Sequence, residues 1–309
     1  MGQGEGRLAA SDADLQVTRA DAPVAAIDVG TNTTRLLVAR AIAGRDRPHA
    51  TGSAMTALGA GLKPGGDIGA AGLDLVAITV RQMADEARRL GAGTVVVACT
   101  APGRTAGNAD DLLRRLAIAS GVTPRVLSGA EEAALAFRGM VAAGAPDPLV
   151  AIDLGDGSLE MMGGRGGALR WATSVPIGVR SLTERFGPAD PPALDLLEPM
   201  VAAVRELLDS VDVPTGASEA LAAGGSAEAL GALAESDVLD RDGLLRAVER
   251  MAATPAADLA EETGIDARRL RLGMAGAAAL EAVRRSFGLD QLRVSRAGLR
   301  EGLVLEASA

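Results

Sequence analysis

The chain has 309 residues, 48% of them hydrophobic, and a formal net charge of −9, so it is long enough for two soluble domains with separate cores. Its single cysteine, Cys99, excludes an intramolecular disulfide and a Cys-rich zinc site. Its single histidine, His49, lies in a polar stretch that predicts a surface position, which argues against Ser-His-Asp and Cys-His catalysis. Any chemistry must therefore rest on carboxylates, arginines, backbone amides or a metal ion.

The charge is unevenly distributed along the chain. Residues 1–150 hold 15 basic and 15 acidic groups, whereas residues 151–309 hold 16 and 25. This acidic half, together with the near absence of aromatic side chains, predicts that nucleic acid is not a partner. No segment has the length and apolarity of a membrane span, and residues 1–22 lack the hydrophobic region of a signal peptide. We therefore expect a cytoplasmic protein without a membrane partner, and we interpret residues 1–22 as a disordered tail.

Strands and helices alternate along the rest of the chain. Two apolar runs, residues 23–30 and 35–43, flank a small polar turn and predict a hairpin. Residues 109–120 carry acids early and arginines later, as a helix dipole favours, with Asn108 as the expected N-cap. Further helices are predicted at residues 73–92, 130–144, 193–211, 226–235, 241–253 and 273–288, and further strands at 94–100, 124–128, 149–155, 159–164, 169–178 and at the start of 220–226. This order predicts an α/β chain with mixed sheets.

One strand-and-turn pattern occurs twice. Residues 24–34 read VAAIDVGTNTT and residues 150–160 read VAIDLGDGSLE, so Asp28 and Asp153 each end an apolar run before a glycine. Such glycine lets backbone N–H groups approach a phosphate, whereas the carboxylate would repel phosphate and suits Mg²⁺. One copy alone would favour an ordinary turn with a solvated acid. Two copies favour two related halves that grip a phosphoanhydride across a cleft.

A pair of glutamates begins the helix predicted after Gly129. Glu131 and Glu132 lie where the positive end of the helix dipole stabilises a carboxylate. An isolated pair of this kind is usually a solvated helix start. Because one of two adjacent helical residues normally points inward, the pattern predicts one general base and no carboxylate dyad.

Seven blocks in this order resemble the Ppx/GppA family of exopolyphosphatases and guanosine pentaphosphate phosphohydrolases. The resemblance spans residues 24–306, and the blocks read AIDVGTNTTRLLVA, ACTAPGRTAGNADDLL, VLSGAEEAALAFRGM, VAIDLGDGSLEMM, SVPIGVRSLTERF, LAAGGSAEALGAL and VSRAGLREGLVLE. It implies two actin-like ATPase (ribonuclease H-like) domains with mixed sheets flanked by helices and a cleft between them. We place domain I at residues 23–139 and domain II at 140–309, with the last helix packed on domain I, as in the short two-domain form of the family.

The resemblance also implies roles for individual residues. Glu131 would activate the attacking water as general base, and Arg104 would neutralise substrate phosphates. Asp153 and Glu160, together with Asp28, would hold Mg²⁺ or Mn²⁺. The expected phosphate-binding residues are Gly30, Thr31, Asn32, Thr33, Arg35, Gly155, Gly157, Ser158, Gly178 and Arg180. The implied reaction is in-line attack of water on a terminal phosphoryl group.

Two residues depart from the family pattern. Asp156 stands where the pattern has glycine, and its carboxylate at ~4 Å from a phosphate would cost about 4 kcal/mol at an effective dielectric near 20. Leu159 stands where the pattern has threonine, so a hydroxyl donor worth roughly 1 kcal/mol is missing.

Three functional hypotheses therefore remain at the level of sequence. The first is an active phosphohydrolase that acts on inorganic polyphosphate or guanosine pentaphosphate. The second is a catalytically impaired member that binds polyphosphate or a nucleotide as a regulatory protein, and the third is a kinase-like ATPase. The alanine-rich late helices allow a homodimer without selecting an interface, and the Ala- and Arg-rich, Lys-poor composition indicates a bacterial source.

Overall fold

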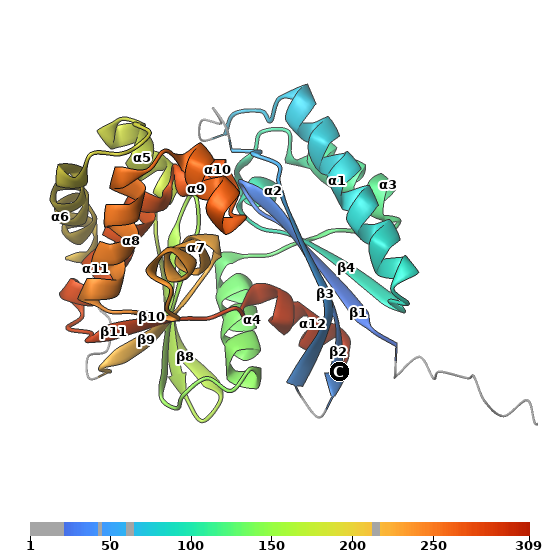
Figure 1. Ribbon diagram of the computed structural model, residues 1–309. Helices are drawn as coiled ribbons and strands as arrows, with labels where there is room; N and C mark the ends of the chain where they lie inside the picture. Colours follow the sequence, from blue (N-terminus) through green and yellow to red (C-terminus); the bar gives the residue numbers. More distant parts are fainter. Residues whose placement is uncertain (1–21, 43–44, 60–64, 212–216) are drawn as a thin grey trace, which may run out of the picture.

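The computed structural model describes residues 22–42, 45–59, 65–211 and 217–309 (Figure 1). Residues 1–21 of the tail expected at the N-terminus lie outside the described residues. In the described ranges, no helix combines the length and the apolarity that crossing a bilayer requires.

The first sheet is built from the N-terminal third of the chain and has the order β3-β2-β1-β4-β5. Strands β1 (Val24–Val29), β2 (Thr33–Ile42) and β3 (Arg45–Met55) form an antiparallel meander, while β4 (Thr94–Cys99) runs parallel to β1 and β5 (Arg125–Val126) runs parallel to β4. Helices α1 (Ala70–Arg89) and α3 (Ala109–Ser120) cover one face, and the short α2 (Ala101–Thr105) follows β4 (Figure 1). Apart from Asp28 near its end, strand β1 is apolar because both of its faces are covered: Ile27 packs on the α1 side and Ala26 on the other.

The second sheet has the order β10-β11-β9-β6-β7-β8. Its strands are β6 (Leu149–Leu154), β7 (Leu159–Arg165), β8 (Ala168–Val175), β9 (Glu219–Ala223), β10 (Val238–Leu239) and β11 (Gln291–Val294). The helices that accompany it are α5 (Val179–Phe186), α6 (Leu197–Leu208) after a 3-10 turn (Leu194–Leu196), α7 (Gly225–Ala234), α8 (Arg241–Ala253), α9 (Ala256–Thr263), α10 (Ala267–Leu270) and α11 (Gly273–Ser286). The largest core of the described chain lies under this sheet and is made of Ala, Leu, Val, Ile and Met.

Two helices, α4 (Gly129–Ala142) and α12 (Leu299–Ala307), lie between the sheets (Figure 1). Helix α4 packs Phe137 and Met140 against the second sheet, whereas α12 packs Leu303 and Val304 against the first. The two helices cross closely, since a Cβ on Gly302 would collide with the backbone oxygen of Leu135. The last helix thus packs on the sheet formed by the first part of the chain. The expected α/β architecture with two mixed sheets flanked by helices is confirmed.

Two local expectations need correction. Asn108 precedes α3, but its side chain makes no capping bond, because both amide atoms bond the backbone of Ile68 at 2.9 Å. The polar stretch around His49 belongs to strand β3, which the sequence reading did not include. Pairing with β2 along its whole length explains how a polar segment becomes an edge strand.

Candidate active site

Two hairpin turns with nearly the same backbone occupy matching places in the two sheets. In the first hairpin turn (residues 28–35) Gly30 N–H donates to the oxygen of Thr33 at 3.1 Å. In the second hairpin turn (residues 153–160) Gly155 N–H donates to the oxygen of Ser158 at 2.9 Å. Each turn follows a strand that pairs in parallel with a strand from later in the chain. These pairs are β1 with β4 and β6 with β9. The repeated sequence pattern is therefore a repeated backbone.

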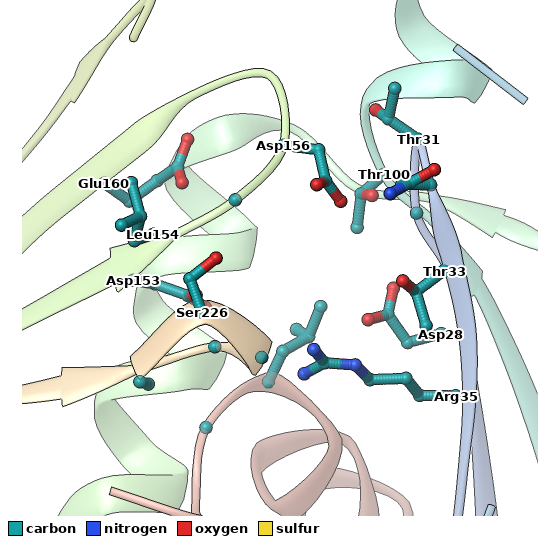
Figure 2. A pocket seen from close by; sticks show the side chains of 18 of the residues that line it. Asp28, Thr31, Thr33, Arg35, Thr100, Asp153, Leu154, Asp156, Glu160 and Ser226 are labelled. Atoms are coloured by element: carbon teal, nitrogen blue, oxygen red, sulfur yellow. The ribbon is translucent and has the colours of Figure 1, made fainter. Parts of the chain in front are cut away.

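The two hairpin turns face one another across one cleft (Figure 2). Arg104 and Glu132 border it on the side of the first sheet, and Ser226 and Arg269 on the side of the second. Most residues expected at the site line this cleft, namely Asp28, Gly30, Thr31, Asn32, Thr33, Arg35, Arg104, Asp153, Gly155, Gly157, Ser158 and Glu160. The cleft expected between the two halves is therefore present.

Glu131 does not line the cleft within the described chain. Its carboxylate caps α4, accepting hydrogen bonds from Ser128 N–H at 2.9 Å and Ser128 Oγ at 2.8 Å, and it pairs with Arg125 at 3.0 Å. These hydrogen bonds lower the pKa of Glu131 to about 2, and those from Ser128 have the largest effect. Such a carboxylate is a weak base that points away from the substrate space, so the placement does not fit the role expected for Glu131.

The neighbouring glutamate, Glu132, lines the cleft in its place. Burial raises the pKa of Glu132 to about 7, although the hydrogen bond from Arg104 opposes this rise. Arg104 Nη1 donates to Glu132 Oε2 at 2.9 Å and to the oxygen of Leu127 at 2.6 Å, which fixes the carboxylate relative to the first sheet. The sequence contained a clue to this exchange: Ser128 followed by Glu131 is the S-x-x-E capping box, which assigns Glu131 to the helix end.

Gly178 and Arg180 are the other expected residues that do not line the cleft in the part of the chain that is described. Gly178 supports the second hairpin turn from behind, since a Cβ there would collide with the backbone of Asp156. Arg180 donates from Nη2 to Asn32 Oδ1 and so reaches the first hairpin turn from the second sheet. Both residues therefore contact the hairpin turns themselves, and direct binding of substrate phosphate by either stays a prediction.

The expected metal ligands lie on both sides of the cleft. Burial raises the pKa of Asp28 to about 6 against the opposing charge of Arg35, and burial also raises the pKa of Asp153. Burial raises the pKa of Glu160 to about 7, although hydrogen bonds, from Ser158 and from Ser174 Oγ at 2.9 Å, oppose this rise. In the described ranges, no three Asp, Glu, His or Cys side chains are already arranged around one metal position.

Asp156 and Leu159, the two departures from the family pattern, lie in different surroundings. The Asp156 carboxylate is turned into the space between the hairpin turns (Figure 2). Leu159 is fully buried in the core of the second sheet. Because position 159 faces the core, a hydroxyl there would not reach the cleft. The expectation that Leu159 removes a hydrogen-bond donor to the substrate is therefore wrong.

Sequence reasoning missed three arginines that line the cleft, Arg269, Arg296 and Arg300. The Arg269 guanidinium lies beside that of Arg35, and a Cβ on Gly225 would collide with both. Burial first, and then the charge of Arg35, lower the pKa of Arg269. Arg269 follows α9 in a segment, IDARRLRL, that gives no local sign of a binding role, because only the chain's return to the cleft places it there.

Comparison with known proteins agrees with this geometry. The model of the Ppx/GppA phosphatase family matches residues 50–308. The chain belongs to the Ppx/GppA phosphatase family. It is therefore a member of a family of hydrolases that release phosphate.

Curated relatives extend over most of the chain. Exopolyphosphatase 1 of Mycobacterium leprae (strain TN) is 29% identical over 301 residues, which covers 90% of this chain and 87% of that protein. Exopolyphosphatase 1 of Mycobacterium tuberculosis (strain ATCC 25618 / H37Rv) is 29% identical over 300 residues, with coverage of 90% and 86%.

Solved structures show the same fold. The Aquifex aeolicus PPX-GPPA enzyme superposes with a TM-score of 0.76 at 24% identity and covers 92% of this chain and 99% of its own. An exopolyphosphatase from Cytophaga hutchinsonii superposes with a TM-score of 0.78 at 22% identity, with coverage of 93% and 97%. The actin-like ATPase fold expected from the sequence is therefore confirmed.

Proposed function

We propose that the protein releases the terminal phosphate of inorganic polyphosphate or guanosine pentaphosphate by attack of water. The observation that carries this proposal is the meeting of two phosphate-type hairpin turns and the half-buried carboxylate of Glu132 at one cleft. Relatives named exopolyphosphatase support polyphosphate as the substrate class.

Glu132 is the residue we propose as general base. A base works best when its pKa lies near the working pH, and burial places the pKa of Glu132 at about 7. Arg104 holds the carboxylate by a 2.9 Å hydrogen bond, so that the oxygen left over can accept a proton from water. Arg104 would thereby have two roles: its charge would neutralise substrate phosphate, and its hydrogen bond would orient the base.

The carboxylates of the cleft fit Mg²⁺ or Mn²⁺. Asp28 Oδ1 is buried and has no hydrogen-bond partner among the described residues, which leaves an oxygen free for a cation. Asp153 and Glu160 supply further oxygens across the cleft, and Mg²⁺ commonly takes one or two carboxylates together with substrate phosphates and water. When bound, the ion would neutralise phosphate charge and stabilise the leaving oxygen.

Arginines from both halves of the chain counter the charge of the substrate. Arg35 comes from the first hairpin turn, Arg269 from the segment after α9 and Arg300 from α12. Positioning and charge neutralisation supply most of the catalysis in phosphoryl transfer, so this convergence supports the proposed reaction.

The experiment compares phosphate release by the purified full chain with Mg²⁺ and polyphosphate, guanosine pentaphosphate or ATP. We expect release from one of the first two substrates, and loss of release in Glu132→Gln. Release from ATP alone would instead support a kinase-like ATPase.

A second candidate function is favoured by Asp156, whose carboxylate faces the phosphate space. If Asp156 prevents turnover, the protein would bind polyphosphate or a nucleotide as a regulatory module. Retained binding of polyphosphate without any release of phosphate would select this alternative.

A further inference from the structure

Arg180 contacts both hairpin turns of the cleft. It is the second residue of α5, and its backbone N–H donates to the oxygen of Asp156 in the second hairpin turn at 3.3 Å. Its Nη2 donates to Oδ1 of Asn32 in the first hairpin turn. One residue thus bridges the two sheets at the cleft, between positions 148 residues apart in sequence.

The contact with Arg180 determines which way the Asn32 amide faces. An arginine side chain has only donors, so the amide must turn its oxygen to Arg180 and its nitrogen to the other side. Asn32 lines the cleft and is only 2% exposed, whereas Arg180 does not line it. With Oδ1 occupied, Nδ2 is the amide atom left to serve the cleft. Nδ2 is a donor, and substrate phosphate oxygens are acceptors.

Without Arg180 nothing in the shape of the side chain would favour this orientation. The two arms of an amide are almost equal in size, so its orientation follows from its hydrogen bonds. A flipped amide would present an oxygen to the phosphate and repel it.

We propose that Arg180 is a positioning residue, which locks the Asn32 amide with Nδ2 toward the substrate. The inference rests on the proposed function, because a phosphate oxygen is the acceptor that Nδ2 meets. The donor is therefore correctly oriented only while the bond between Asn32 and Arg180 is made.

In this proposal the guanidinium itself is not a second phosphate ligand. Arg180 Nε is buried without a hydrogen-bond partner among the described residues, and Nη2 is engaged by Asn32, so the group serves the hairpin turn. This distinguishes Arg180 from Arg35 and Arg269, which line the cleft.

The sequence provides a direct test, since it contains two asparagines, Asn32 and Asn108. Protein labelled with ¹⁵N only at asparagine gives two side-chain amide signals in NMR spectra. Asn108 is an internal control, because both of its amide atoms are bonded to Ile68. We expect Arg180→Ala to move or broaden the Asn32 signal and to leave the Asn108 signal unchanged. An Asn32 signal that is the same in both proteins would overturn the proposal.

Tripolyphosphate is the probe for the second half of the inference. It should shift the Asn32 side-chain protons in the wild-type protein, and Arg180→Lys, which keeps a donor, should respond in the same way. The response should be lost in Arg180→Ala. If the probe binds but leaves the Asn32 protons of the wild type in place, Nδ2 does not serve the substrate and the proposal fails.

Kinetics separate positioning from a structural effect. Loss of one donor to a charged group corresponds to about a tenfold rise in KM, so Arg180→Ala should raise KM about tenfold while kcat stays within about twofold. Arg180→Lys should recover most of the lost affinity. Asn32→Asp keeps an acceptor for Arg180 but faces the phosphate with an oxygen, so its KM should rise further than that of Arg180→Ala. A fall in kcat with unchanged KM in Arg180→Ala would contradict the proposal.

Arg185 provides the matched control on the same helix. Its guanidinium lies over the ring of Phe186 at 5.6 Å and carries the same charge. Arg185→Ala should leave KM and kcat unchanged. If the wild-type protein neither binds tripolyphosphate nor releases phosphate, the proposed function fails, while the ligand-free comparison of the Asn32 signals still decides whether Arg180 positions the amide.

Discussion

The two hairpin turns share a backbone but carry opposite charge patterns at one matching position. Asp28 in the first hairpin turn pairs across the strands with Arg35, whereas Asp153 in the second pairs with Glu160. The first pair is a carboxylate with a guanidinium, and the second is two carboxylates. Repetition of a strand and turn has therefore reproduced the geometry without reproducing the electrostatics.

This difference assigns distinct partners to the two sides of the cleft. Arg35 partly offsets the effect of burial on Asp28, whose pKa is raised only to about 6. Glu160 has Asp153 as a neighbour, and its pKa, raised mainly by burial and further by that like charge, lies at about 7. The second hairpin turn therefore places two carboxylates side by side, a set that favours a divalent cation more than the Asp28–Arg35 pair of the first does.

Helices α4 and α12, which begin next to the cleft, also share a backbone feature but differ in the residue that follows it. Glu131 caps α4 by accepting from Ser128 N–H, and Glu301 accepts from Gly298 N–H at 2.7 Å at the start of α12. The residue after the first capping glutamate is Glu132, and the residue after the second is Gly302. The residue that we propose as general base thus has no counterpart at the second helix start.

The largest effect is expected from removing that base. Glu132→Gln should lower kcat by about 10³, within the range that general bases contribute, when phosphate release from polyphosphate is measured. Glu131→Gln is the matched control: it should keep activity within about twofold and lower the free energy of unfolding by roughly 1 kcal/mol through loss of the cap. If Glu131→Gln instead abolished turnover, the assignment of the base would be reversed.

The next largest effect should separate the two hairpin turns. Arg35→Gln should raise KM for polyphosphate by about 10- to 100-fold, because a charged donor to phosphate is lost, without changing the Mg²⁺ concentration for half-maximal activity. Glu160→Gln should raise that Mg²⁺ concentration by about tenfold or more, because a carboxylate ligand is lost. Titration with Mn²⁺, followed by electron paramagnetic resonance, checks the second variant without turnover. If both variants raised the Mg²⁺ requirement equally, the two hairpin turns would not differ in their part in metal binding.

The sequence predicted the fold and most of the cleft because these depend on local patterns. The run of apolar residues before Asp28 and Asp153, followed by glycine, is enough to predict a buried strand that ends in a tight turn. Periodicity likewise predicted α1, α4 and α11. The domain boundaries proposed at residues 139 and 140 remain a prediction.

What the sequence did not predict depends on contacts between distant segments. Arg269 reaches the cleft only because α9 and α10 return the chain beside α7, and no spacing within its own segment shows this. Arg180 was expected to bind phosphate, but its partner, Asn32, lies in the other sheet. Glu131 and Glu132 differ by one helical position, and the side chain of Ser128 decides which of them is used as the cap.

A smaller effect is expected from the side chain that distinguishes the second hairpin turn. Asp156→Asn removes the charge and keeps the size, and Asp156→Gly removes both. At ~8 Å from a phosphate and an effective dielectric near 20, the charge costs about 2 kcal/mol, so KM for polyphosphate should fall roughly tenfold to thirtyfold in both variants. A rise in KM together with a weaker response to Mg²⁺ would identify Asp156 as a cation ligand.

The smallest effect concerns pH and tests the side of the cleft that carries the base. Burial raises the pKa of Glu132 to about 7, Arg104 opposes that rise, and Asp28 and Asp153 add to it. A base must be deprotonated, so kcat/KM should fall as the pH drops below about 7. In Arg104→Gln the opposing charge is gone, the pKa of Glu132 rises, and the acidic limb of the profile should move to higher pH. Glu160 also has a raised pKa of about 7 but belongs to the second hairpin turn, and Arg104 is not among the groups that shift it. A limb that stays in place in Arg104→Gln would therefore assign the titration to Glu160.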